Sequence, residues 1–370
     1  MLDVWIYNGE TATNISGDRV DNRVDGTYTE ETNAIPSASF TIYPNNTGFN
    51  QLTEFVTRVR IFKKEKCVFS GRVILVEPSV ESNGTVSKKV TCEGCLGFLN
   101  DTFAYPLIGR LEGYDITLTK AVQFMIDFHN KQVGESSKKY IVYSPPASNT
   151  ILENVEVTAE SSTWGVLSQE AFTDDLDFKI TDDLTKLTLS VLGDGDVGGG
   201  VELTLDVNMQ SISIVPSFDI CTRVVPFTTE GLPMGTIGMN ETDYYVEDKN
   251  SKKIYGVIAK GHKFDSVKKT TSLKEKATKW LKKNSSIIKS IRVSALDLYD
   301  QGITPAQFEV GKTYPIRCPQ INFNETVKLR KVTRDINDEW NVQLEFGEKK
   351  YSAKRYIKLN KYKKGMKLWV

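Results

Sequence analysis

Residues 37–43, Ser-Ala-Ser-Phe-Thr-Ile-Tyr, alternate small or polar side chains with apolar ones. The same period of two recurs in residues 57–62, Thr-Arg-Val-Arg-Ile-Phe. This alternation is typical of strands that bury one face. Further strands are predicted at 73–76 and 85–91, separated by turn-forming residues. The first hundred residues or so therefore predict a small β-barrel or sandwich.

The pattern changes after residue 100. Leu118, Val122 and Met125 recur at helical spacing, with Asp115 as a candidate N-cap, and a second helix is expected near 162–172. Strands are predicted at 176–181 and 186–192, so this stretch has an α+β pattern. A glycine run from 193 to 200 then interrupts the chain.

Strands resume near 201–226. A helix is predicted over 273–283, where Ser272 and Glu275 have the spacing of a capping box. The closing strands are expected near the following ranges: 288–296, 313–318, 326–334 and 339–346.

These patterns predict a β-rich, multidomain α+β protein with two β-barrel-like domains and two peripheral α+β domains. The first barrel-like domain is expected at 1–100 and the second from 201–226 joined to 289–348. The peripheral domains are expected at 101–200 and, as an insertion, at 227–288. Residues 349–370 form a basic C-terminal tail.

Composition fits several modest cores. The chain has 370 residues, of which 39% are hydrophobic and 25% charged, and its formal net charge is zero. A chain without net charge has no overall electrostatic attraction for nucleic acid. The start has no pattern of a signal peptide, and no apolar run approaches the length of a membrane span, so no stable membrane insertion is expected.

Charge is nevertheless uneven. Residues 170–206 are acidic and 249–289 are rich in lysine. The tail mixes basic with aromatic residues, a composition that can grip phosphates or dock on an acidic partner, although a solvated terminus explains it equally well. The candidate partner or DNA contacts in the tail are Lys354, Arg355, Lys358, Lys361, Lys363 and Lys364.

Motifs that suggest chemistry have plainer explanations. Gly311-Lys312-Thr313 resembles the end of a phosphate loop, but Ala306 stands where that loop needs glycine, and a turn is predicted. The stretch from Asp194 to Asp196 resembles a calcium loop but lacks its last glutamate, so a flexible turn is predicted.

The cysteine and histidine residues do not indicate a catalytic or metal site. The five cysteines are unevenly spaced, and Cys92 and Cys95 form a single CxxC pair that lacks two further zinc ligands. His129 and His262 are the available histidine bases, with no nucleophile motif near either. We therefore expect no enzyme activity, no catalytic or metal residue and no cofactor.

Several stretches, in order, resemble one family. Residues 67–73, Cys-Val-Phe-Ser-Gly-Arg-Val, precede 90–101, Val-Thr-Cys-Glu-Gly-Cys-Leu-Gly-Phe-Leu-Asn-Asp. Seven more stretches follow in this order: 208–214, 221–226, 272–283, 291–298, 308–314, 332–336 and 344–347. Together they resemble the phage tail baseplate hub proteins, the tail-associated lysozyme-type or prophage endopeptidase tail family, which is similar to the contractile-tail baseplate hub. Each motif is weak; their order carries the resemblance.

The resemblance implies a homotrimer whose two barrel-like domains per subunit form a ring that closes the tail tube and opens for DNA ejection. It implies as partners the distal tail protein ring, the tail tube, the tape measure protein and the phage DNA in the channel. It places the protein in the virion, at the tail tip or baseplate, after assembly in the host cytoplasm. The alternatives are a cell-wall hydrolase or peptidase of the tail tip, which needs a catalytic constellation, and a host-surface binding module, which needs an exposed aromatic patch.

Overall fold

The computed structural model describes the following residues: 2–17, 22–104, 116–146, 151–152, 157, 161–169, 172, 176–193, 200–216, 220–228, 244–264, 270–286 and 289–347. The chain divides into two units. The larger comprises Met1–Ile212 and Val293–Glu345, and the smaller comprises Ser213–Arg292 and Phe346–Val370.

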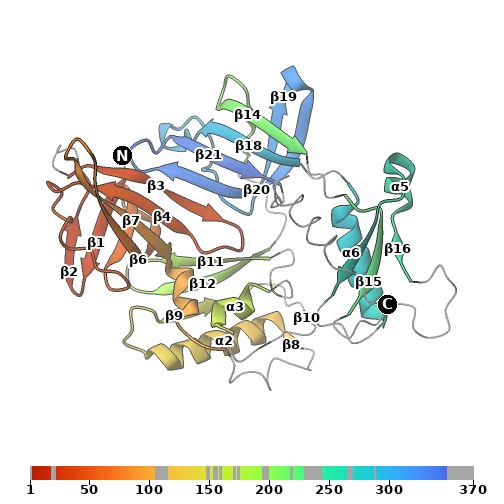
Figure 1. Ribbon diagram of the computed structural model, residues 1–370, viewed down its shortest axis with the longest axis horizontal. Coiled ribbons are helices and arrows are strands. Elements are labelled where there is room, and N and C mark those ends of the chain that lie inside the picture. Colours follow the sequence, from red (N-terminus) through yellow and green to blue (C-terminus); the bar gives the residue numbers. More distant parts are fainter. Residues whose placement is uncertain are drawn as a thin grey trace. The chain divides into compact units, whose positions relative to one another are not determined.

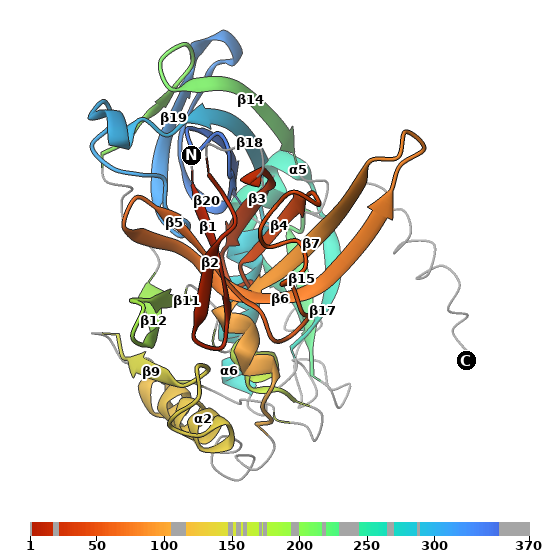
Figure 2. The same ribbon diagram turned by 90° about the vertical axis from the view of Figure 1, so that its left-hand side faces the viewer.

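A 13-stranded sheet dominates the larger unit and curls into an open half-barrel (Figures 1 and 2). Its strand order is β14-β18-β21-β20-β3-β4-β7-β6-β5-β1-β2, with β13 and β19 joined to β20 at the side. Seven strands precede residue 95: β1 (Asp3–Asn8), β2 (Thr11–Asn14), β3 (Val24–Glu31), β4 (Ser37–Ile42), β5 (Arg58–Lys63), β6 (Lys66–Val80) and β7 (Val86–Gly94). Six follow residue 202: β13 (Leu203–Thr204), β14 (Met209–Pro216), β18 (Lys289–Leu296), β19 (Thr313–Cys318), β20 (Phe323–Asp335) and β21 (Asn341–Phe346).

The alternation predicted from sequence is confirmed in these strands. In β4, Ala38, Phe40 and Ile42 are buried while the residues between them are not. In β5, Val59 and Ile61 enter the same core. Strands β6 and β7 form a long hairpin that projects beyond the rest of the sheet (Figure 2).

One sheet, rather than two separate barrels, contains both groups of strands. β20 pairs antiparallel with β3, from Lys331 opposite Glu31 to Asp335 opposite Thr27. Arg330 of β20 forms an ion pair with Glu31 of β3 across this junction, and a second one with Glu345 of β21. A β-rich fold is thus confirmed, whereas the expected layout of two barrels and two peripheral domains is not.

An α+β segment follows β7 in the larger unit. It contains η2 (Cys95–Asn100), β8 (Ile116–Thr117), α2 (Leu118–Val133), β9 (Ile141–Ser144), β10 (Ile151–Leu152), α3 (Thr163–Leu167), β11 (Leu176–Asp182) and β12 (Leu187–Gly193). β12 pairs with both β11 and β9, and the helices share one apolar core with this small sheet. Two short 3₁₀ helices, η4 (Tyr299–Gln301) and η5 (Pro319–Ile321), lie between the later strands.

Helix ends differ from the predictions. Thr117 occupies the N-cap position of α2 without a side-chain capping hydrogen bond, and the predicted cap Asp115 lies outside the described residues. The second helix is shorter than expected, running from Thr163 to Leu167, because Ser162 caps it and Ser168 already ends it.

The smaller unit contains β15 (Arg223–Phe227), β16 (Val246–Glu247), α5 (Lys249–Tyr255), β17 (Ala259–Lys263) and α6 (Thr270–Asn284). β15 lies between β16 and β17, although we expected this strand in the second barrel-like domain. α6 places Leu273, Ala277 and Leu281 in the core, as its apolar stripe predicts. It begins at Thr270, so Ser272 lies in its first turn rather than at the predicted cap.

Candidate interaction surface

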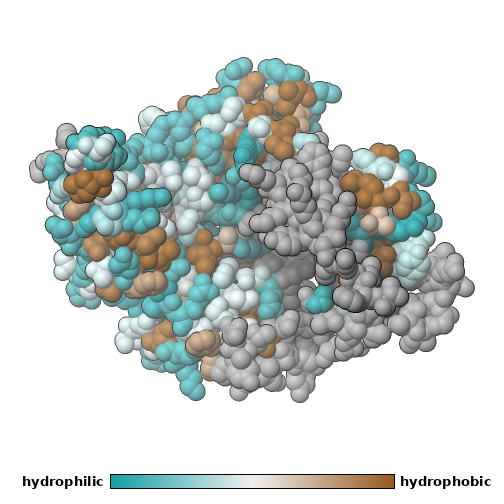
Figure 3. Space-filling view, viewed as in Figure 1, coloured by the Kyte–Doolittle hydropathy of each residue, from teal (hydrophilic) through white to brown (hydrophobic). Residues whose placement is uncertain are grey.

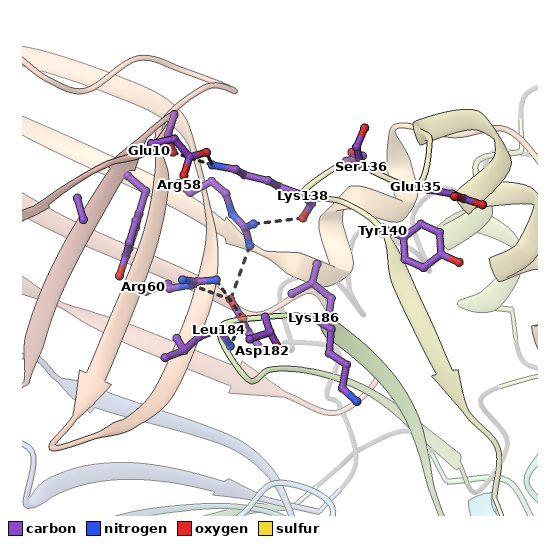
Figure 4. Close-up of a pocket in the computed structure, with 16 residues that line it drawn as sticks. Glu10, Arg58, Arg60, Glu135, Ser136, Lys138, Tyr140, Asp182, Leu184 and Lys186 are labelled. Carbon is purple, nitrogen blue, oxygen red and sulfur yellow. Dashed lines mark hydrogen bonds and ion pairs between the residues drawn. The ribbon is translucent and has the colours of Figure 1, made fainter.

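Two arginines of β5 point from the sheet toward the α+β segment. Arg58 and Arg60 are two residues apart, so they share one face of the strand. Arg60 donates to both carboxylate oxygens of Asp182, at 2.8 and 3.1 Å (Figure 4). The Ser70 hydroxyl donates to the same carboxylate at 2.6 Å. The Asp182 side chain is 2% exposed. This carboxylate is therefore held by a bidentate arginine and a hydroxyl.

Arg58 has weaker partners. Its nearest carboxylate oxygen, on Asp182, is 3.7 Å away, and one terminal nitrogen donates to the Lys138 carbonyl at 3.1 Å (Figure 4). Its Nε is buried and has no hydrogen-bond partner. Two guanidinium groups thus share one carboxylate, and the unbalanced positive charge is centred on Arg58.

A neighbouring charge cluster is balanced. Arg72 on β6 donates to Glu93 at 2.7 Å and to both oxygens of Asp101, at 2.6 and 2.8 Å. Lys139 also donates to Asp101, at 2.7 Å. Burial by itself raises the pKa of Asp101, but the hydrogen bonds from Arg72 and Lys139 outweigh it and lower the pKa below its ordinary value. This cluster fastens η2 to the sheet.

An open pocket of about 510 Å³ lies over Arg58 and Arg60. The β1–β2 hairpin, β5, the loop at 135–140 and the β11–β12 turn surround it (Figure 4). A second pocket of about 240 Å³ adjoins it and shares Tyr7, Arg58 and Lys138 with it.

The second pocket is flanked by an exposed apolar pair. Phe55 and Val56 are 62% and 63% exposed. Phe55 has a φ of +61°, a conformation that a bulky residue rarely adopts. Hydrogen bonds hold it there, since its amide donates to the Val73 carbonyl at 2.7 Å and the Val73 amide donates to Thr57 at 2.9 Å. The ring therefore stands at the surface on a fixed backbone.

In the view of Figure 3, the hydrophobic residues of the described part of the chain lie in several separate groups. A face of this kind has no single broad patch that would mark an interface by size alone. Local combinations of shape and charge, such as the pair of pockets, are therefore the better guide.

The two histidines hold structural positions. His129 is buried on α2, with Nδ1 2.9 Å from the Thr102 hydroxyl and Nε2 2.9 Å from the Lys139 carbonyl. Burial lowers its pKa, which keeps the ring neutral. His262 stacks on Trp280, with ring centroids 4.3 Å apart.

All five cysteines are free thiols. Cys92 and Cys95 are buried, and burial raises the pKa of both; for Cys67 it rises to about 12. Thiols of this kind behave as small apolar side chains. Within the described residues, no group of three His, Cys, Asp or Glu could hold a metal ion.

Other predicted positions have mixed outcomes. Gly311 has a φ of +91° and leads into β19 rather than a helix, so the turn is confirmed. Asp194 to Asp196 and all six basic tail candidates lie outside the described residues.

The sequence reading missed the pair of pockets. Arg58 and Arg60 were visible as the polar face of a predicted strand, and Asp182 as one acid among many. Nothing in the sequence linked residues 122 positions apart.

Comparison with known proteins connects this fold to phage tails. Residues 199–357 match the family model described as prophage endopeptidase tail. The C-terminal part of the chain therefore resembles a phage tail family. No curated protein matches its sequence.

Solved structures with the same fold are also tail proteins. The 43 kDa tail protein of prophage MuSo2 from Shewanella oneidensis has a TM-score of 0.66 at 12% identity, covering 94% of this chain and 98% of that one. A tail protein from Neisseria meningitidis MC58 has a TM-score of 0.63 at 13% identity, covering 94% and 96%. The prophage tail protein gp18 from Listeria monocytogenes EGD-e has a TM-score of 0.57 at 10% identity, covering 98% and 100%.

The resemblance to a phage tail family expected from sequence is thereby confirmed. In the described part of the chain, no helix is both long enough and apolar enough to span a membrane.

Proposed function

We propose that this protein belongs to a phage tail and is a structural hub of the tail tip or baseplate. Three copies form a ring that closes the tail tube and opens to let DNA leave. The observation that carries the proposal is the composite sheet, in which one group of strands precedes residue 95 and another follows residue 202. A subunit with two groups of strands can present two β surfaces, so three subunits offer six to a six-fold tube. Cyclic closure also limits growth of the assembly.

Its partners in this proposal are the distal tail protein ring, the tail tube and the tape measure protein, with DNA passing through the channel. Opening in this proposal is conformational, with the subunits of the ring moving against one another as packed bodies. The basic tail at 349–370 is proposed to contact a partner or DNA.

Antibody-gold labelling of tail particles tests the position. A tag at the N-terminus of the chain should place gold at the distal end of the tail. Particles that carry an untagged chain serve as the control. Gold along the tail shaft, or at the head-proximal end, would contradict a tip location.

We also propose that the chain is not an enzyme. Both ring nitrogens of His129 are occupied by structural contacts, so it has no free nitrogen to act as a general base. The Ser70 hydroxyl does donate to a carboxylate, but that carboxylate, on Asp182, already accepts two hydrogen bonds from Arg60.

A zymogram on peptidoglycan checks this directly. The pure chain should produce no clearing, and the Ser70→Ala variant should behave identically. Clearing that disappears in Ser70→Ala, or in a variant of a single Asp or Glu, would establish a hydrolase instead.

A further inference from the structure

The unbalanced charge at Arg58 is the first of two observations that point to a ligand. Asp182 is already engaged by Arg60 and Ser70. Lys138 adds a second cation at the same edge; its own carboxylate neighbour, Glu10, is 3.5 Å away and 99% exposed. A pair with so exposed a partner neutralises little charge. The pocket over Arg58 therefore favours an anionic group from outside.

The second observation is the exposed apolar pair beside it, in which Phe55 has a strained backbone. A phenylalanine held at positive φ costs free energy that a glycine would avoid. The loop nevertheless keeps Phe55 and Val56 at the surface, and the Arg72 guanidinium lies 5.2 Å from the Phe55 ring centroid. Exposed aromatic side chains on a rigid backbone are good anchors for binding, because little entropy is lost when they are covered.

The two features are contiguous. Arg58 and Lys138 line both pockets, with the basic pocket on one side and Phe55 and Val56 on the other. A ligand that spans the pair meets a cationic group and an apolar surface in succession.

From this geometry we propose that Arg58, Lys138, Phe55 and Val56 form a docking site for an extended acidic peptide segment of another protein. A carboxylate of the segment binds between Arg58 and Lys138, and an adjacent apolar side chain packs on Phe55 and Val56. Charge complementarity selects this occupant, because a basic segment would add to the excess positive charge at Arg58. The docking site goes beyond the proposed hub function and holds whether or not the chain forms a ring.

Fluorescence anisotropy with the full chain tests the site. The probe is a fluorescein-labelled peptide of about eight residues in which Glu and Leu alternate. One control peptide has Lys in place of Glu, and another has Ser in place of Leu. The Glu–Leu peptide should bind, and each control should bind at least about tenfold more weakly, since tenfold corresponds to losing one such contact.

Two variants separate docking from folding. Lys138→Glu reverses an exposed charge, and Phe55→Gly removes the ring while relieving the positive φ. Each should weaken probe binding about tenfold without lowering the melting temperature. The matched controls are Lys120→Glu, on the exposed surface of α2, and Ile303→Ala, whose side chain is 66% exposed; both should bind as the wild type does.

Three outcomes would overturn the proposal. They are equal binding of the Glu–Leu and Lys–Leu peptides, no binding of the Glu–Leu peptide, and unchanged binding by Lys138→Glu and Phe55→Gly. Sedimentation supplies a fourth: if Phe55→Gly dissociates an oligomer of the pure chain, a second copy covers the site rather than a different protein. Because the probe assay does not depend on ring formation, its failure would leave the hub proposal standing.

Discussion

Strand β5 shows how much of the candidate site the pattern of side chains predicts. The alternation in residues 57–62 predicts which side chains face the core, and Val59 and Ile61 do so. It also predicts that Arg58 and Arg60 lie on the other face. It does not predict Asp182 as their shared partner, because that contact depends on how the β11–β12 turn packs on the sheet. The sequence therefore predicts the orientation of the two arginines but not the carboxylate that they share.

At the residue scale, Asp182→Asn should destabilise the larger unit. The change leaves two largely buried guanidinium groups without their carboxylate, and breaking such a pair costs about 3 kcal/mol or more. Urea unfolding followed by tryptophan fluorescence measures the loss.

The neighbouring Asp183→Asn is the matched control. Asp183 is exposed and accepts hydrogen bonds from the Thr185 and Lys186 amides within its own turn. Asparagine can accept them too, so the expected loss is below about 1 kcal/mol. Equal losses in the two variants would mean that Asp182 has no special role.

At the scale of elements, the sequence predicted which strands and helices exist better than it predicted the residues at which they begin and end. All the strands expected in the first hundred residues are present. α6 begins before its predicted capping box, and α3 ends early. Periodicity extends through an element, whereas its ends depend on a few local hydrogen bonds that several serines or threonines could supply.

The pairing of β6 with β7 depends on a close approach at Gly71. A methyl group there would lie 2.0 Å from the Glu93 carbonyl oxygen, which is backbone and cannot move aside. We expect Gly71→Ala to lower the free energy of unfolding by about 3 kcal/mol.

Gly17→Ala provides the comparison, because nothing lies within 4 Å of its added methyl group. It should change stability by less than about 0.5 kcal/mol. The midpoints of chemical unfolding report both variants. A Gly71→Ala protein as stable as the wild type would show that the two strands are not held at this distance.

At the scale of the whole molecule, the sequence predicted a β-rich fold but not how its strand groups combine. β3 and β20 are about 300 residues apart in the chain, and their alternating patterns fit a separate barrel each as well as one shared sheet. The seam includes the backbone pairing of β20 with β3 and the ion pair of Arg330 with Glu31, and a single sequence marks out neither of them. The domain boundaries predicted from sequence stay a prediction.

The hub proposal requires that the functional unit contain three chains. Multi-angle light scattering measures this most directly, on the purified protein and on its complex with the distal tail protein. The predicted mass of the hub component is three times 41.6 kDa, about 125 kDa. A mass of one chain, in isolation and in the presence of that partner, would contradict the account.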